Sequence, residues 1–289
     1  MSKSIKKFFK LSLLLVFVVG VFAGCSGDKE GAGDKKITLG VTPWTSTIPP
    51  TKVARLILED MGYTVEEISA DAGGVYAGLS KGDIDAYFDS WLPDIHKNYM
   101  ESFGSTIEDV AISYPDGELG WVIPAYVEGI DSIEDIKGNE ALFEGKVYGI
   151  EEGAGMTMTS REMIPAYGLD LEYVASSEGG MLAQASKLIL NKKPVIFLGW
   201  RPHPMFVNYE LKVLQDPQGF FKTSEVHVLA HQSLKEKYPD VHSFLSKWSI
   251  DVGDVEQMIV DIEAGESAED VAQKWIDNNQ DKVKMMTGK

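Results

Sequence analysis

Apolar residues form two kinds of pattern in the first part of the chain. Ile37 to Val41 is a short, nearly continuous apolar run that predicts a buried strand. Lys52 to Met61 carries its apolar residues at helical spacing and is followed by Gly62, so it predicts a helix that ends there. The alternation continues with an expected strand at 63–68, helix at 75–80 and strand at 84–88. Strands that alternate with helices are typical of a parallel sheet covered by helices.

The same alternation occurs a second time. The expected elements are a strand at 146–151, a helix at 156–167, a strand at 171–174, a helix at 181–190 and a strand at 194–198. Two extended apolar segments, 120–127 and 225–231, separate the two sets of elements and predict crossings between them. Helical patterns follow at 241–248, 255–264 and 268–278, and the acids of the last two indicate a solvated helix face rather than a metal site.

Two α/β units joined by two extended crossings predict two lobes with a hinge. We expect lobe 1 to comprise residues 37–123 and 230–289, and lobe 2 to comprise residues 124–229. Ligands of open α/β sheets bind at the carboxyl ends of the strands, so the strand ends of both lobes are expected to face one ligand cleft.

Composition and charge narrow the class of protein. The chain has 289 residues, of which 44% are hydrophobic and 25% charged, as in ordinary globular proteins. Asp and Glu number 44 against 27 Lys and Arg, which gives a net charge of −17. Nucleic-acid binding needs a basic surface, so this charge argues against a nucleic-acid-binding protein. A single cysteine excludes an internal disulfide and a cysteine-rich metal site.

The N-terminus predicts export. Residues 1–24 have a lysine-rich start and then a twelve-residue apolar run, Leu11 to Phe22, which is too short to span a membrane and typical of a signal peptide. The string Val21-Phe22-Ala23-Gly24-Cys25 resembles the lipobox of bacterial lipoproteins, which implies cleavage before Cys25 and a diacylglycerol on its sulfur. With a lipid on Cys25, residues 25–36 would be a lipid-anchored flexible tether, and the expected location is the outer face of the cytoplasmic membrane. An ordinary secretory peptide with an incidental cysteine is the alternative.

Catalytic motifs are missing from the sequence. No HExxH, GxSxG, CxxC or GxxxxGK[ST] string occurs, and Asp83-Ile84-Asp85 does not begin a calcium-binding loop because Phe88 stands where glycine is needed. We therefore expect no catalytic residue, no metal and no cofactor. A secreted enzyme that processes choline is the rival from another class.

Three of the six tryptophans predict a binding site. Trp44, Trp91 and Trp200 each come just after an expected strand and before a proline-containing loop, which would place them at the mouth of the cleft. A quaternary ammonium has no N–H to donate, and indole faces bind its spread charge well. Buried core packing is the ordinary interpretation of the others, Trp121, Trp248 and Trp275.

Two strings carry a family resemblance. Trp91-Leu92-Pro93-Asp94-Ile95-His96 and the string from Gly199 to Phe206 (GWRPHPMF) resemble the glycine betaine-binding proteins of compatible-solute ABC importers, over about residues 37–284. The resemblance implies a two-lobed periplasmic-binding-protein fold of type II-like order. It also implies a tryptophan cage of Trp44, Trp91 and Trp200 for trimethylammonium, and a monomer that works with an ABC permease and its ATPase subunits. Pro204 departs from the aromatic that often follows the histidine, which affects the expected outer wall of the pocket.

The carboxylate of a betaine needs a separate site. Gly153-Ala154-Gly155 links an expected strand to the helix near Met156, and helix N-termini bind anions. The resemblance implies that the amides of Gly155 and Met156 bind the carboxylate and that His96 adds a side-chain donor, whereas His203 is expected to be structural. A tight turn is the alternative interpretation of the glycines. Choline or carnitine is the alternative ligand, and the sequence does not separate glycine betaine from proline betaine.

Overall fold

The computed structural model describes residues 35–289. The predicted signal peptide, Cys25 and the tether up to residue 34 lie outside these described residues. Lys36, which the sequence assigned to the tether, is the first residue of strand β1 (Lys36–Val41). None of the helices described between residues 35 and 289 has both the length and the apolar character of a membrane-crossing segment.

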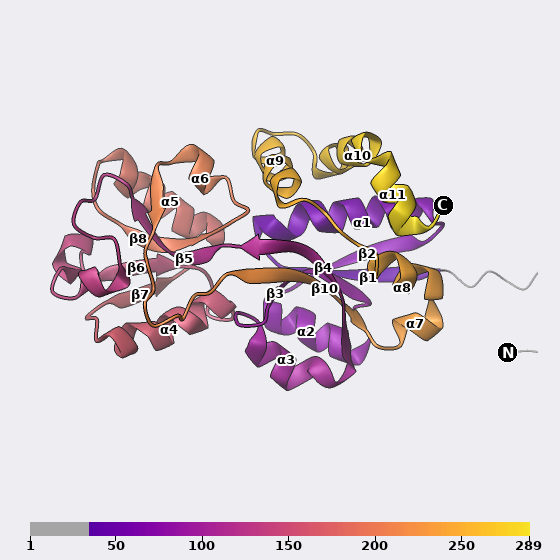
Figure 1. Cartoon of the computed structure of the whole chain (residues 1–289), viewed down its shortest axis with the longest axis horizontal. Helices are drawn as coiled ribbons and strands as arrows, with labels where there is room; N and C mark the ends of the chain where they lie inside the picture. The colour runs from indigo at the N-terminus through magenta and orange to yellow at the C-terminus, as the bar shows by residue number, and fades with distance from the viewer. Residues whose placement is uncertain (1–34) are drawn as a thin grey trace, which may run out of the picture. The chain divides into compact units, whose positions relative to one another are not determined.

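The first sheet has five strands in the order β2-β1-β3-β10-β4 (Figure 1). Its strands are β1, β2 (Thr64–Ser69), β3 (Ala86–Leu92), β4 (Ile107–Gly117) and β10 (Ser224–His231). β1 is parallel to both β2 and β3, whereas β10 runs antiparallel to β3 and β4. Its first helices are α1 (Ile48–Asp60), α2 (Ala72–Lys81) and α3 (Lys97–Phe103). This sheet and the helices packed on it are called lobe 1.

The second sheet repeats the design in the order β7-β6-β8-β5-β9. Its strands are β5 (Leu119–Pro124), β6 (Lys146–Gly149), β7 (Glu172–Ala175), β8 (Ile196–Trp200) and β9 (Leu211–Val213). Its helices are α4 (Gly155–Tyr167), α5 (Glu178–Leu190) and α6 (Met205–Asn208). β6 is parallel to β7 and β8, and β5 is antiparallel to β8. This sheet and its helices are called lobe 2, and the α/β architecture with two parallel-rich sheets matches the prediction.

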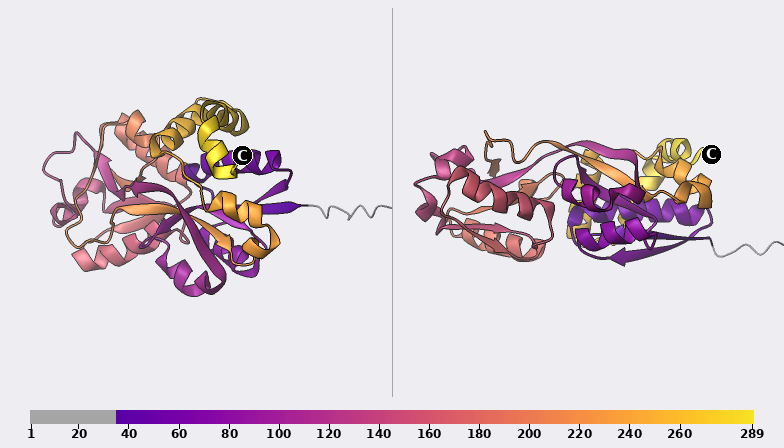
Figure 2. Two further views of the ribbon diagram at one scale, coloured as in Figure 1. Left: turned by 45° about the vertical axis from the view of Figure 1, so that its right-hand side comes forward. Right: turned by 90° about the horizontal axis from the view of Figure 1, so that it is seen from below.

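The chain passes between the sheets twice, through β4 and β10 (Figure 2). β4 ends at Gly117 and β5 begins at Leu119 in the other sheet, and β10 returns the chain to the first sheet from Ser224. The sequence analysis placed the boundaries between the lobes at 123/124 and 229/230, several residues later than the points where the chain changes sheet. Apolar extended residues look alike on either side of a crossing, and only the pairing partner decides to which sheet they belong.

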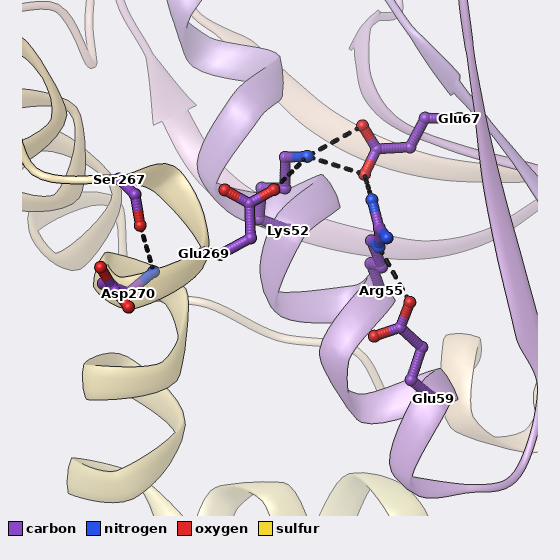
Figure 3. Close-up of polar contacts among 7 residues, drawn as sticks. All are labelled: Lys52, Arg55, Glu59, Glu67, Ser267, Glu269 and Asp270. Carbon is purple, nitrogen blue, oxygen red and sulfur yellow. Dashed lines mark hydrogen bonds and ion pairs between the residues drawn. The ribbon is translucent and has the colours of Figure 1, made fainter.

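Helices after β10 complete lobe 1. They are α7 (Leu234–Lys237), α8 (Pro239–Leu245), α9 (Val252–Glu263), α10 (Ala268–Asn278) and α11 (Gln280–Thr287). α10 packs on α1, and Lys52 lies between Glu67 and Glu269, with its Nζ at 3.0 Å and 2.9 Å from their carboxylates (Figure 3). Short 3-10 turns also occur, at Thr45–Thr47, Gly104–Thr106, Ile133–Ile136 and Glu140–Phe143. Glu269 of α10 thus forms an ion pair rather than a metal site.

The tryptophans expected in the core are there. Trp121, Trp248 and Trp275 are all buried. Each indole N–H has an acceptor: Ser160 Oγ for Trp121, Ser113 Oγ for Trp248 and Asp254 Oδ2 for Trp275, at 2.8–2.9 Å. Buried indoles need such partners, and none of the three faces the pocket described next.

Candidate functional site

A pocket lies between the lobes. Its walls are aromatic and aliphatic, with few polar groups. The lining residues are Trp44, Ser46, Trp91, Ile95, His96, Leu119, Ile150, Ala154, Gly155, Met156 and Trp200. The structure therefore brings all six predicted ligand-binding residues together, while their role in binding stays a prediction.

The three pocket tryptophans do not all follow strands. Trp44 stands in the loop after β1, as expected, but Trp91 lies inside β3 and Trp200 is the last residue of β8. Pairing with a neighbouring strand extends both: Trp91 lies opposite Val226 of β10, and Trp200 opposite Leu119 of β5. The apolar run alone did not reveal these partners.

Carboxylates hold two of the indole rings. Trp44 Nε1 donates to Glu151 Oε1 at 2.9 Å, and Trp91 Nε1 donates to Asp89 Oδ1 at 3.0 Å. Glu151 belongs to lobe 2 and Trp44 to lobe 1, so the first of these bonds joins the lobes. A donor fixed at its N–H edge leaves the face of the ring free for a ligand.

His96 is neutral and has one nitrogen left to donate. It is buried, and burial lowers its pKa to about 3. Its Nδ1 accepts a hydrogen bond from the backbone N–H of Trp91 at 3.1 Å. The proton of the neutral ring must therefore lie on Nε2. Nε2 has no hydrogen-bond partner among the described residues, so His96 can present an N–H to a ligand in the pocket.

Helix α4 supplies two further donors. Its N-cap is Ala154, and the first helical residues are Gly155 and Met156. The first N–H groups of a helix have no acceptor within it, and among residues 35–289 none is recorded for these two. A Cβ at Gly155 would meet the Ile95 carbonyl oxygen at 2.2 Å, so only glycine allows the two lobes to approach this closely here.

Buried acids lie behind the pocket wall. Asp89 accepts from Ser46 Oγ at 2.9 Å and Thr47 Oγ1 at 2.7 Å in addition to Trp91. Burial raises the pKa of Asp89 to about 7, although these hydrogen bonds oppose the shift. Glu178 of α5 accepts from the Thr45 backbone N–H at 3.1 Å and thereby also joins the lobes.

His203 has the structural role that the sequence predicted. Its Nδ1 accepts from the Met205 N–H at 2.9 Å, which leaves Nε2 to face Glu178 Oε1 at 3.1 Å. The ring also meets Trp200 edge-on, with 4.9 Å between centroids. His203 thus braces Trp200 and Glu178 from behind, and it does not line the pocket.

Sequence reasoning missed the acids around the cage. Asp89 stands two residues before Trp91 in one strand, so the period of two puts both side chains on the same face. That spacing was a usable signal. Glu151 and Glu178 carried none, because their contacts to Trp44 and Thr45 join residues more than 100 positions apart. Within residues 35–289 no group of three or more His, Cys, Asp or Glu side chains is arranged to hold a metal ion.

Comparisons with known proteins agree on one family. Residues 35–278 match the model of the substrate-binding domain of ABC-type glycine betaine transport systems, OpuAC. A curated relative is the glycine betaine/carnitine transport binding protein GbuC of Listeria monocytogenes, which is 32% identical over 145 residues, or 49% of this chain. The matched stretch spans about half of that relative's length (48%).

Solved structures are similar over most of the chain. Lactococcal OpuAC in complex with glycine betaine has 29% identity and a TM-score of 0.82, and covers 88% of this chain and 100% of its own. The glycine betaine/L-proline-binding protein ProX of Borrelia burgdorferi has 28% identity and a TM-score of 0.84 over 87% and 96% of the two chains. A choline-binding protein of an ABC transporter, in complex with choline, has 25% identity and a TM-score of 0.83 over 88% and 92%. With the family model matched over residues 35–278, the chain belongs to the family of substrate-binding domains of ABC-type glycine betaine transport systems.

Proposed function

We propose that this protein captures glycine betaine, and proline betaine by the same groups, outside the cytoplasm and delivers it to an ABC permease for osmoprotective import. The observation that carries the proposal is the division of one pocket into two kinds of wall. Three indoles, those of Trp44, Trp91 and Trp200, face the same space as three N–H donors.

The indole wall suits the trimethylammonium end. Methyl groups around a positive nitrogen accept no hydrogen bond, and each ring face is worth about 0.5–2 kcal/mol to such a cation. Three rings would supply a useful share of the roughly −8 kcal/mol of micromolar binding. The apolar neighbours Leu119 and Ile150 exclude water without offering competing polar groups.

The donor wall suits the carboxylate end. His96 Nε2 and the amides of Gly155 and Met156 would each be left without a partner when the pocket closes on a ligand that lacks an anion. Leaving a buried donor unpaired costs about 1–3 kcal/mol, whereas a charge-assisted hydrogen bond is worth about 1.5–3 kcal/mol. The pocket therefore favours a betaine over choline.

Choline is the second candidate, because a structural relative at 25% identity is a choline-binding protein. Titration calorimetry of the purified protein with glycine betaine, proline betaine, carnitine and choline separates them. We expect glycine betaine to bind at least about tenfold more tightly than choline, since about 1.4 kcal/mol is a factor of ten. Equal binding of choline would reject the carboxylate site and make choline the ligand.

An enzyme acting on choline is the rival from another class. Incubation of the protein with glycine betaine or choline, followed by mass analysis, should return both unchanged. A new product that depends on the protein would replace transport by catalysis.

We also propose that Cys25 carries the lipid that anchors the protein. Cys25→Ala should release the protein from the membrane fraction of the host while leaving betaine affinity as in wild type, because the pocket lies among residues 44–200. Mass analysis of the membrane-bound wild type should find acyl chains on the N-terminal cysteine; an unmodified Cys25 there would contradict the anchor.

A further inference from the structure

Asp89 lies directly behind the tryptophan cage. It is a central residue of β3 with no exposed surface. Its Oδ1 accepts from the indole of Trp91, and its Oδ2 accepts from the hydroxyls of Ser46 and Thr47. Trp91 and Ser46 both line the pocket. The carboxylate is therefore one hydrogen bond away from the pocket wall at two places.

No cation balances this carboxylate in the part of the chain that the structure describes. Burial is the main cause of its raised pKa, and the charged group that adds to the shift is Glu178, which has the same sign. Buried carboxylates are normally paired with a cation, because removing an ion from water is costly. The other two acids near the cage differ from Asp89: Glu178 faces His203, and Glu151 is only partly buried, so solvent screens its charge.

We propose that Asp89 is the counter-charge of the ligand's quaternary ammonium and sets the preference of the cage for a cationic over a neutral head group. This inference rests on the proposed function, because it needs a trimethylammonium group in the cage. Asp89 does not touch the ligand; it is a positioning residue that acts through Trp91. A negative charge at the N–H edge of the indole polarises the ring and makes the face that meets the ligand more negative.

Two ligands of the same shape, one with and one without the positive charge, isolate the effect of that charge on binding. Glycine betaine and 3,3-dimethylbutanoate have the same shape, but the second has a neutral carbon where the first has the positive nitrogen. The substitution Asp89→Asn removes the charge and keeps an oxygen that can accept from Trp91 Nε1. We expect Asp89→Asn to weaken glycine betaine about tenfold or more, and 3,3-dimethylbutanoate less than about twofold, since only the first ligand loses a Coulomb attraction.

Asp254→Asn is the control variant. Asp254 also accepts from a tryptophan, with its Oδ2 at 2.8 Å from Trp275 Nε1, but neither residue lines the pocket. Both affinities should stay as in wild type in this variant. If Asp89→Asn left glycine betaine binding unchanged, or weakened both ligands equally, Asp89 would have only a structural role and the inference would be wrong.

Proton release gives a second measurement if 3,3-dimethylbutanoate binds too weakly to titrate. At pH 7 a carboxyl with a pKa of about 7 is half protonated, so binding of a cation should release up to about half a proton. Calorimetry in two buffers of different ionisation enthalpy measures this release. It should vanish in Asp89→Asn, and a proton release of equal size in wild type and Asp89→Asn would contradict the inference. A wild type that binds no trimethylammonium solute at all would instead refute the proposed function.

Discussion

Single side chains divide the pocket between a cation and an anion. The indole of Trp91 is fixed at its N–H edge by Asp89 within lobe 1, so its face is oriented before a ligand arrives, whereas the bond from Trp44 to Glu151 forms when the lobes meet. His96 is likewise fixed, through its Nδ1, in the tautomer that donates from Nε2. Preorganised groups lose little conformational entropy on binding, and this smaller entropy cost raises the affinity for the ligand.

Removing one aromatic face should weaken binding without unfolding the protein. In Trp200→Leu the side chain stays apolar while the cation–π contact is lost, so we expect glycine betaine to bind about threefold to thirtyfold more weakly. Trp275→Leu is the matched control: it should lower the melting temperature, because Trp275 is buried against α9, and leave the dissociation constant unchanged. Calorimetry and thermal melts of both variants check this. Wild-type affinity in Trp200→Leu would argue against the cage.

Betaine affinity should depend on pH through Asp89. Its pKa is raised to about 7, mainly by burial, so the carboxyl gains its charge as the pH rises from 6 to 8. The charged form attracts the cation, and affinity should therefore rise over this range by up to about tenfold. His96, with a pKa of about 3, stays neutral throughout. The other ionisable groups that act on Asp89 are Glu178 and the phenols of Tyr76, Tyr87 and Tyr114, whose raised pKa values keep them uncharged.

The same shift affects the stability of the ligand-free protein. The folded state holds the Asp89 proton up to about pH 7, whereas the unfolded chain releases it near its ordinary pKa of 3.8. This carboxyl therefore lowers the free energy of unfolding as the pH rises from about 4 to 7.

Betaine affinities at pH 6 and 8 test the predicted pH dependence of binding. A flat profile in wild type, or an equal slope in Asp89→Asn, would contradict it.

Among the elements, the start of helix α4 links ligand binding to lobe contact. Gly155 packs against the Ile95 carbonyl of the other lobe, while its own amide points to the anion site in our proposal. Nearby, the Tyr99 hydroxyl donates to the Gly153 carbonyl, so lobe 1 grips the loop before α4 as well. A helix N-terminus is thus presented to the ligand only when the lobes meet.

Gly155→Ala should hinder closure of the lobes. The new Cβ would meet the Ile95 oxygen at 2.2 Å, and that backbone atom cannot move aside without shifting the lobe. Alanine favours a helix, so the fold of lobe 2 should be retained. We expect at least about a tenfold loss of betaine affinity, which corresponds to about 1.4 kcal/mol. Gly153→Ala is the control, because the nearest atom to a Cβ there is Tyr99 Oη at 3.7 Å. Equal affinities in the two variants would show that close approach at Gly155 is not needed.

At the scale of the whole molecule, the sequence predicted the architecture better than its boundaries. Periodicity located most strands and the longer helices of both lobes, because strand runs and helical stripes are local signals. β4, β9 and the short helices α3, α6, α7 and α11 escaped prediction: β4 has a mixed burial pattern, and the others are only three to eight residues long. Six pocket residues were predicted from two strings, a glycine turn and, for Trp44, its place after a strand. Glu151 and Glu178 depend on contacts between lobes that no local pattern carries.

Polar contacts join the two lobes around the pocket. Glu178 bonds Thr45, Glu151 bonds Trp44, and Arg201 of lobe 2 lies 3.7 Å from Glu256 of α9. Because these polar contacts are few, they can be broken and remade as a hinge bends. We therefore expect the ligand to complete the contact between the lobes, with its cation held by indoles and its anion held by N–H groups.

A crystal structure with glycine betaine bound tests this account most directly. The quaternary nitrogen should lie within about 6 Å of the ring centroids of Trp44, Trp91 and Trp200. The carboxylate should lie at about 2.7–3.2 Å from His96 Nε2 and from the amides of Gly155 and Met156. A ligand with its carboxylate among the indoles, or one bound outside this pocket, would contradict the account.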